Sequence, residues 1–429
     1  MAGIVDDRRI RFKHIPRTTL SRVATFLGST AMALDVRSFA CSCKLASVAV
    51  QKLPSMTAKV DPPEAPEIHP DGSLRELEAD VLVRLSRAGL AVQVLRLEGA
   101  VTAECAVAAL RSCANAHCLE LNSSSAVWWG TAVAASGRGV ASDRVTTLVV
   151  DRTHQLYQFD AMVASLPALT SLTVVGCPDI TQDDLEAAVP GLGGLRQLTL
   201  SRCRGVNDFA LGAVSAALPS PSRMERLCLS SSPAITSSGV GAFVAAHAGL
   251  VSLDIAMCSR VAEDVCSALV ASGVLPSLRR LRLPPSVGDA GLSGLIAGAG
   301  GAAAASAHGG PSPLGRLEHL GLSMSSVTDS GLAAVLGAAP ARRVLDLQGC
   351  AAMSFRVVDT IVSAGRSLQR VDIRGHRRLR WDDAAKLVAG LPDLVLVVAD
   401  APIATSTKLL EAAGPCSVRL RESPGLVAV

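Results

Sequence analysis

LTSLTVVGCPDITQDDL, residues Leu169–Leu185, is the stretch that decides the fold, because its apolar residues recur at an uneven spacing. Leu172 and Val174 lie two residues apart, which is the period of a β-strand with one buried face. Cys177 and Ile180 then follow at intervals of three residues. We expect them to point inward where the chain turns, before a helix begins near Gln182. The stretch therefore predicts a strand, a turn and a helix in one short unit.

The same pattern begins twelve times along the chain. Its starts are residues 92, 116, 145, 169, 195, 224, 250, 278, 317, 342, 368 and 391. The intervals between starts run from 23 to 29 residues, apart from one interval of 39. That interval contains AGAGGAAAASAHGGPSP, and we expect this Gly/Ala segment, residues 297–313, to be an inserted flexible loop. A repeated unit of this length indicates a solenoid, since one unit cannot bury its own apolar edge.

We predict an α/β solenoid shaped like a horseshoe, with a parallel β-sheet on the concave face and helices outside. The helices are expected where apolar residues recur at spacings of three and four. The clearest of these stretches are QDDLEAAV, DFALGAVSAAL, SSGVGAFVAAHA, EDVCSALVA, DAGLSGLI, DSGLAAVLGAA, FRVVDTIVSAG and DDAAKLVAG. Asp, Ser or Thr stands near most of their starts, as helix capping favours.

The repeats follow the form LxxLxLxxCxx[IV][TN], most clearly at Leu169–Thr181, Leu195–Asn207 and Leu250–Val261. This form resembles the cysteine-containing leucine-rich repeats, and the resemblance covers about residues 92–400. In that family the repeats often follow an F-box, a helical module that docks a substrate receptor onto a cullin ubiquitin ligase through an adaptor protein.

The N-terminal segment resembles an F-box in the order of its apolar residues. Ile15-Pro16 form the opening apolar-Pro pair, and Leu20, Val23 and Leu27 follow at helical spacing. The resemblance implies that these five residues bind the adaptor. The late Trp usual in that module is absent. A plain capping pair of helices and a targeting sequence remain the alternatives.

We divide the chain into four parts. Residues 10–52 form the F-box-like helical segment, and residues 53–73, which are rich in proline, form a linker. An amphipathic helix at 74–91 caps the first repeat, since the ends of a solenoid need covering. The leucine-rich-repeat domain then spans residues 92–415.

Composition limits the classes of function. Of 429 residues, 49% are hydrophobic and 18% charged, which excludes bulk disorder. The formal net charge of +4 is too small to indicate bulk nucleic-acid binding. No apolar run is long enough to cross a membrane, and the N-terminus lacks the apolar core of a secretory signal. We expect a cytoplasmic protein, with the nucleus as an alternative and the mitochondrion less favoured.

The sequence carries no catalytic or metal-binding pattern. It lacks a nucleophile elbow, a phosphate-binding loop and a zinc-binding helix motif, so we expect no enzyme activity, no cofactor and no small-molecule substrate. Four cysteines share one repeat position, where a column about 5 Å apart could not converge on zinc. Those cysteines are Cys177, Cys203, Cys258 and Cys350, with Ser232, Ser286, Ser325 and His376 at the same position in other repeats. A small residue with a weak donor near backbone carbonyls explains the column.

The residues between the repeat leucines should point out of the concave face, and several are arginines. Interleaved acids prevent a uniformly basic surface, and arginine pairs bidentately with carboxylates, which favours a protein partner with acidic groups. A nucleic acid is less favoured because stacking aromatics are almost absent, and we expect no membrane partner. An ordinary solvated strand face is the alternative. The partner-binding candidates are Arg226, Asp254, Arg280, Arg282, His319, Asp346, Arg370, Asp372 and Arg374.

Two functions remain open at this point. The first is a protein-interaction module, in its sharper form the substrate-recognition subunit of a cullin-type ubiquitin ligase. The second is a leucine-rich-repeat scaffold or structural subunit of a larger mitochondrial or cytoskeletal assembly, in which the N-terminal segment has no F-box role.

Overall fold

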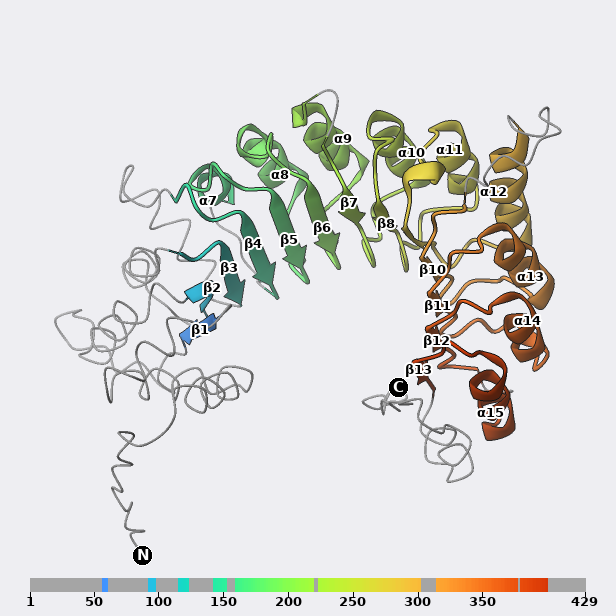
Figure 1. The fold of residues 1–429 in the computed structure, drawn as a ribbon. Coiled ribbons are helices and arrows are strands. Elements are labelled where there is room, and N and C mark those ends of the chain that lie inside the picture. The colour runs from blue at the N-terminus through green and yellow to red at the C-terminus, as the bar shows by residue number, and fades with distance from the viewer. Residues whose placement is uncertain are drawn as a thin grey trace, which may run out of the picture. The chain divides into compact units, whose positions relative to one another are not determined.

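The computed structural model describes residues 56–60, 92–97, 115–122, 142–152, 159–219, 223–301, 314–376 and 379–399. The chain divides into two compact units, Met1–Leu169 and Thr170–Val429, and each is described by itself (Figure 1). Among the described residues, no helix has the length and apolar character needed to pass through a bilayer.

The described residues of the first unit contain four parallel strands that pair in chain order. They are β1 (Met56–Val60), β2 (Val92–Leu97), β3 (Cys118–Asn122) and β4 (Thr147–Asp151). A short helix, α7 (Phe159–Ala164), follows β4. Strands β2 to β4 lie at the first three expected repeats.

Strand β1 corrects the expectation of a linker over residues 53–73. Its five residues, Met56–Val60, pair in parallel with β2. The sequence MTAKV alternates apolar and polar residues and lies between Pro54 and Pro62, so an extended conformation satisfies both its pattern and its flanking prolines. The expected F-box-like segment 10–52 and capping helix 74–91 lie outside the described residues.

The second unit contains nine parallel strands, again paired in chain order. They are β5 (Ser171–Val175), β6 (Gln197–Ser201), β7 (Arg226–Cys228), β8 (Ser252–Asp254), β9 (Arg280–Arg282), β10 (His319–Gly321), β11 (Val344–Asp346), β12 (Arg370–Asp372) and β13 (Leu396–Val398). The register keeps equivalent residues side by side, as in Leu281 beside Leu320. Each strand lies at one expected repeat, but β13 aligns Val397 with Val371, so the last repeat starts at Leu394 and not at the expected residue 391.

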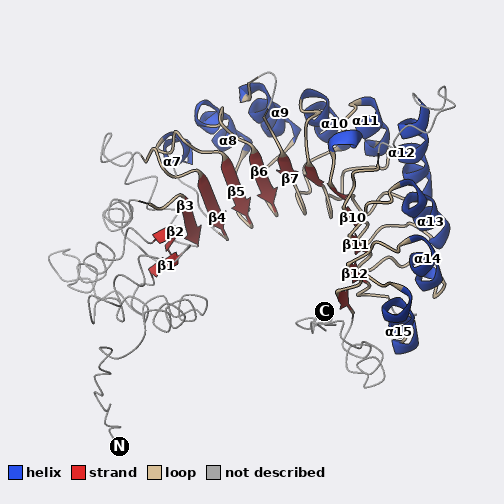
Figure 2. Ribbon diagram, in the orientation of Figure 1, coloured by secondary structure: helices blue, strands red, loops and turns tan. Residues whose placement is uncertain are grey.

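Eight helices alternate with these strands. They are α8 (Gln182–Ala188), α9 (Asp208–Ala217), α10 (Ser237–Ala246), α11 (Val265–Ala271), α12 (Asp289–Gly301), α13 (Asp329–Ala338), α14 (Val357–Ala364) and α15 (Trp381–Gly390). Within this unit the strands line the inner side of a curved array and the helices its outer side (Figure 2). All eight predicted helical stretches are confirmed.

Helix α12 runs further than the sequence suggested. It reaches Gly301, so the first five residues of the expected loop, 297–301, are helical instead. Three of these five residues are glycines, so helix propensity does not explain the extension. The glycines instead allow α12 to pack closely on α11, since a β-carbon at Gly298 would lie 2.5 Å from Val270 Cγ1. Residues 302–313, the rest of that loop, lie outside the described residues.

The core lies between the strand layer and the helix layer. Leu172 and Val174 are fully buried, as are their equivalents Leu198 and Leu200 in the next repeat. Leu185 and Leu211 close the core from the helix side and are also fully buried. Stacking of successive repeats makes this core continuous through the unit.

Arg342 stands in the core at a repeat position that most other repeats fill with leucine. It is only 1% exposed, and its guanidinium donates to carbonyl oxygens near the end of α13, at 2.9 Å from Val335 O and also to Leu336 O. A third, longer bond reaches Ala364 O at the end of α14. A positive charge is favourable at helix C-termini, which offsets part of the cost of its burial.

Several helices are capped by a carboxylate from the preceding repeat. Asp208 accepts from Thr236 N at 2.9 Å, and Asp289 accepts from Thr328 N at 2.8 Å. Asp329 likewise accepts from Ser354 N at 3.0 Å. Each carboxylate begins one helix and satisfies the backbone at the start of the next, so the cap also ties neighbouring repeats together.

Candidate protein-binding surface

The strands of the second unit present two rows of side chains on the face opposite the helices. Side chains alternate along a strand, so the residues flanking each buried leucine point away from the core. The first row consists of Ser171, Gln197, Arg226, Ser252, Arg280, His319, Val344, Arg370 and Leu396. The second row consists of Thr173, Thr199, Cys228, Asp254, Arg282, Gly321, Asp346, Asp372 and Val398.

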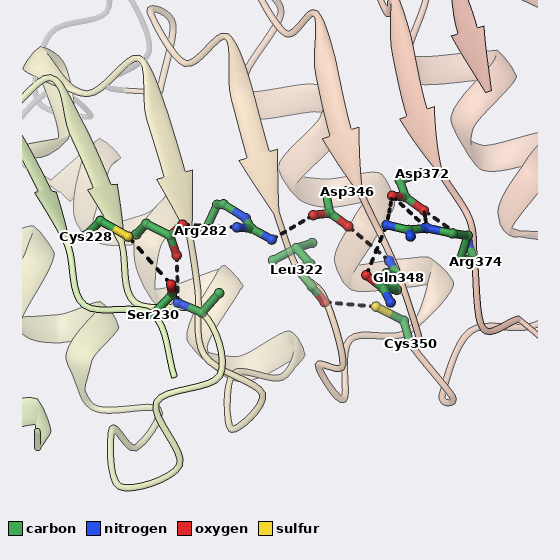
Figure 3. Close-up of polar contacts among 11 residues, drawn as sticks. Cys228, Ser230, Arg282, Leu322, Asp346, Gln348, Cys350, Asp372 and Arg374 are labelled. Atoms are coloured by element: carbon green, nitrogen blue, oxygen red, sulfur yellow. Dashed lines mark hydrogen bonds and ion pairs between the residues drawn. The ribbon is translucent and has the colours of Figure 1, made fainter. Parts of the chain in front are cut away.

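Arg282 joins three repeats in the second row. Its Nη1 lies 3.0 Å from Asp254 Oδ2 on the preceding strand, and its Nη2 lies 3.0 Å from Asp346 Oδ2 two strands further on (Figure 3). The side chain reaches that far because Gly321 stands between them. A β-carbon at Gly321 would lie 2.7 Å from Arg282 Cγ, so only glycine leaves the path open.

The aspartates of the second row also hold the backbone. Asp254 Oδ1 accepts from Ala256 N at 3.0 Å, and Asp346 Oδ1 accepts from Gln348 N at 3.2 Å. Each carboxylate therefore fixes the turn that follows its own strand while pairing with Arg282. Asp254 and Asp346 therefore stabilise the structure of this surface by holding both the backbone turns and Arg282 in place.

Asp372 repeats this arrangement one strand later. Its Oδ2 lies 2.7 Å from Arg374 Nη2, and its Oδ1 accepts from the backbone N of Arg374 at 3.2 Å. Arg374 also donates to Gln348 Oε1 at 3.3 Å, which links the two repeats (Figure 3). Asp372 is only 3% exposed, so it is enclosed by these contacts.

The remaining acids of this face are paired as well. Glu225 lies 3.3 Å from Arg196 Nη1, and Glu318 lies 2.8 Å from Arg279 Nη1. Every described carboxylate on the face of β5 to β13 therefore has an arginine partner on the same face.

Four arginines on this face are left over. Arg226, Arg280 and Arg370 belong to the first row, and Arg343 immediately precedes β11; all four are exposed, and none forms an ion pair with a described carboxylate. Arg226 donates only to the neutral Gln197 Oε1, at 3.3 Å. The aspartates of the second row are therefore neutralised by ion pairs with arginines, whereas the first row carries a net positive charge.

His319 lies in the first row beside Arg280. Burial lowers the pKa of its imidazole, and the charge of Arg282 lowers the pKa further, although Asp346 partly opposes this. His319 is therefore held in its neutral form near neutral pH.

The nine residues predicted for this face all lie on it, but in two groups. Asp254, Arg282, Asp346, Asp372 and Arg374 form the internal ion pairs, whereas Arg226, Arg280 and Arg370 stay exposed in the first row, which also contains His319. The sequence analysis missed Gly321 and Gln348, which complete the network. The signal for Gly321 was glycine at a strand position where other repeats carry a side chain.

The cysteine column lies away from this surface, beneath the turns that follow the strands. Cys203, Cys258 and Cys350 donate to the carbonyl oxygen of the preceding repeat's last apolar strand position, with Cys258 Sγ 2.9 Å from Leu229 O. Ser232 and His376 make the equivalent contact at their positions. Among the described residues, no group of His, Cys, Asp and Glu could hold a metal ion.

Ser286 departs from the column. It is exposed and donates to Val261 O at 2.6 Å, because its turn, LPPSVGD, is shorter than the others. The predicted adaptor-binding residues, Ile15, Pro16, Leu20, Val23 and Leu27, lie outside the described residues.

Comparison with known proteins supports the fold. No protein-family model matches the sequence, and no curated protein matches it. The chain is similar to one in the crystal structure of the Rad7 and Elc1 complex in yeast, with a TM-score of 0.56 and 11% identity over 95% of this chain and 91% of that chain. It is also similar to the leucine-rich repeat-containing protein LegL7 of Legionella pneumophila, with a TM-score of 0.40 and 15% identity over 83% of this chain and 97% of that one. The repeats, register and layers define this chain as a leucine-rich-repeat solenoid.

Proposed function

We propose that this chain is a non-catalytic interaction protein that binds a partner protein on the strand face of its second unit. The observation that carries the proposal is the set of four exposed arginines on that face, beside acids that are all paired within it. Unpaired arginines on a rigid sheet are suited to bind carboxylates, because the guanidinium fork needs little reorganisation. We further propose that the chain acts in the cytoplasm.

The sharper proposal concerns the N-terminal segment, residues 10–52. Ile15, Pro16, Leu20, Val23 and Leu27 would bind the adaptor of a cullin-type (SCF-like) ubiquitin ligase, while the strand face holds the protein to be ubiquitinated. The similarity to a chain crystallised in a complex of Rad7 with Elc1 supports a role in assembly with another protein. In this role the chain raises the effective concentration of target near the ligase and performs no chemistry itself.

Affinity purification of the full chain tests the ligase proposal. We expect a cullin-ligase adaptor to co-purify with the wild type and to be lost from the Ile15→Ala/Pro16→Ala/Leu20→Ala triple variant. The Asp6→Ala/Asp7→Ala/Arg8→Ala variant is the matched control, since it changes three residues outside segment 10–52 and should keep the adaptor.

Absence of the adaptor from the wild-type purification would contradict the ligase role and favour the scaffold alternative. The N-terminus of the protein isolated from cells gives a second readout. Removal of roughly the first thirty residues would identify a targeting sequence instead of an adaptor-binding module.

A further inference from the structure

We propose that Arg280 and Arg370, here called the arginine patch, bind an extended acidic segment of a partner protein that crosses strands β9 to β12. The inference rests on the proposed function and adds to it the chemistry and spacing of the bound segment.

The arginines of the patch are free to bind a partner because the neighbouring carboxylates of the chain pair with other arginines. Arg282 lies two residues after Arg280 on β9 and forms ion pairs with Asp254 and Asp346, at 3.0 Å each. Glu318, which immediately precedes β10, pairs at 2.8 Å with Arg279. No carboxylate is left on the described face to compete with an incoming one.

The register fixes the distance between the two ends of the patch. Arg280 is aligned with His319, His319 with Val344, and Val344 with Arg370. Three steps between neighbouring strands separate Arg280 from Arg370, which corresponds to about 14 Å at roughly 4.8 Å per step. An extended chain advances about 3.3 Å per residue, so about four residues cover the same distance.

The side-chain alternation of an extended chain makes this spacing selective. Residues i and i+4 lie on the same side of a strand, so acidic residues at those positions face Arg280 and Arg370 together. Residue i+2 then lies over His319 and Val344, which are only half-buried and present a neutral surface. The patch therefore favours the pattern acidic-x-apolar-x-acidic, with the apolar residue over His319 and Val344.

Fluorescence anisotropy with labelled peptides tests this pattern on the full chain. The first peptide carries Glu at positions one and five and Val at position three. The second has the same composition with its Glu residues three apart, which places them on opposite sides, and a third replaces Glu by Gln. We expect the first peptide to bind at least about fivefold more tightly than either of the others, because only it engages both arginines.

Alanine variants locate the binding. Arg280→Ala and Arg370→Ala should each weaken binding of the first peptide about fivefold or more. Arg366→Ala is the matched control, because Arg366 is an exposed arginine in the turn between α14 and β12 and lies outside both rows of the strand face. Its affinity should stay within about twofold of the wild type if the patch, and not net charge, holds the peptide. All three side chains are exposed, so the variants should keep the wild-type unfolding midpoint.

A charge swap provides an independent check. Arg370→Glu should lose the first peptide and regain affinity for a peptide with Lys at position five. Equal binding of the two Glu spacings, or equal loss in Arg366→Ala, would overturn the proposal. Tighter binding of a single-stranded RNA of equal charge, lost in the same patch variants, would overturn it in favour of a nucleic-acid surface.

The two proposals can fail separately. The triple variant of Ile15, Pro16 and Leu20 leaves the patch intact, so it should bind the first peptide like the wild type. Arg370→Ala leaves the N-terminal segment intact, so it should keep the adaptor. Loss of the adaptor alone contradicts the ligase role, and absence of peptide binding alone contradicts the acidic-segment inference.

Discussion

Gly331 shows how one residue without a side chain can hold two repeats together. It is the third residue of α13, and Asp289 of the preceding repeat occupies the space that a β-carbon would need. Burial alone would raise the pKa of the Asp289 carboxyl, but hydrogen bonds from Thr328, Ser330 and Gly331 lower it. Glycine is therefore required at this position because the Asp289 carboxylate fills the space of a β-carbon, and not because of the backbone angles of Gly331.

Replacing this glycine should reverse the usual effect of alanine in a helix. We expect Gly331→Ala to lower the free energy of unfolding by about 1–3 kcal/mol, because the new methyl group displaces Asp289 from its cap. Urea unfolding followed by circular dichroism measures the change.

Gly337 lies in the same helix and is the control, since a β-carbon there meets nothing within 4 Å. Gly337→Ala should raise the free energy of unfolding by up to about 1 kcal/mol, as helix propensity dictates. Equal effects of the two substitutions would contradict the role given to Asp289.

At the scale of the element, the cysteine column stabilises the turns that end the strands. Cys203, Cys258 and Cys350 each donate to a carbonyl oxygen of the preceding repeat, as Cys203 does to Val174 O and Cys258 to Leu229 O. Burial raises the pKa of Cys203 to about 12 and that of Cys258 to about 11. The thiols therefore stay protonated, which keeps them both donors and poor nucleophiles.

This predicts how the thiols react in the folded chain. At about pH 8 no more than about one in a thousand Cys258 side chains is a thiolate, so iodoacetamide should leave Cys203 and Cys258 unmodified. Cys118, which is less buried, should be alkylated under the same conditions. Mass spectrometry of the digested chain reads both outcomes, and unfolding in urea should expose every site. Alkylation of Cys258 as fast as Cys118 would contradict its placement.

The elements that sequence analysis could predict are those specified by their own residues. The strand of each repeat follows from two leucines at period two, and the helices from α8 to α15 follow from their apolar spacing. Helix α7, Phe159–Ala164, was missed because six residues are too few for the period to repeat. Strand β1 was hidden by the prolines on either side of it, although it has its own alternation.

The candidate surface was predictable in its membership but not in its pairing. Strand alternation placed Arg280 and Arg282 on one face, yet it did not distinguish the exposed arginine from the ion-paired one. The partners of Arg282 lie 28 and 64 residues away along the chain, and reaching the second depends on the glycine of an intervening strand. Contacts of this kind depend on the stacking of three repeats, which no single repeat encodes.

At the scale of the whole molecule, two histidines couple stability to pH. Burial lowers the pKa of His247 from its usual 6.5, and His319 is shifted in the same direction. His247 is only 4% exposed and contacts Ser215 Oγ through Nε2 at 2.8 Å. A histidine whose pKa is lower in the folded chain binds protons more readily when unfolded, so acid favours unfolding.

We therefore expect the free energy of unfolding to fall as pH decreases below 6.5, the pKa of an unperturbed histidine. Urea unfolding at about pH 7.5 and at about pH 5.5 measures the difference. His247→Gln should make the dependence shallower, because glutamine can keep a hydrogen bond to Ser215 without titrating. A pH dependence unchanged by that substitution would remove His247 as its source.

The carboxylate caps between repeats all run in one direction, because each acid caps the helix of the repeat that follows its own. Asp289 caps the helix of the next repeat by accepting from Thr328 N. The helix that Asp289 begins is capped in turn by Glu263 of the preceding repeat, which accepts from Gly288 N at 2.9 Å. A tandem duplication of such a repeat would place its acid against a copy of its own glycine, Gly291, the counterpart of Gly331. The two copies of the repeat would then pack together with both the acid and the glycine that the contact needs. The array can therefore lengthen or shorten by whole repeats over evolution without a new interface having to arise by mutation.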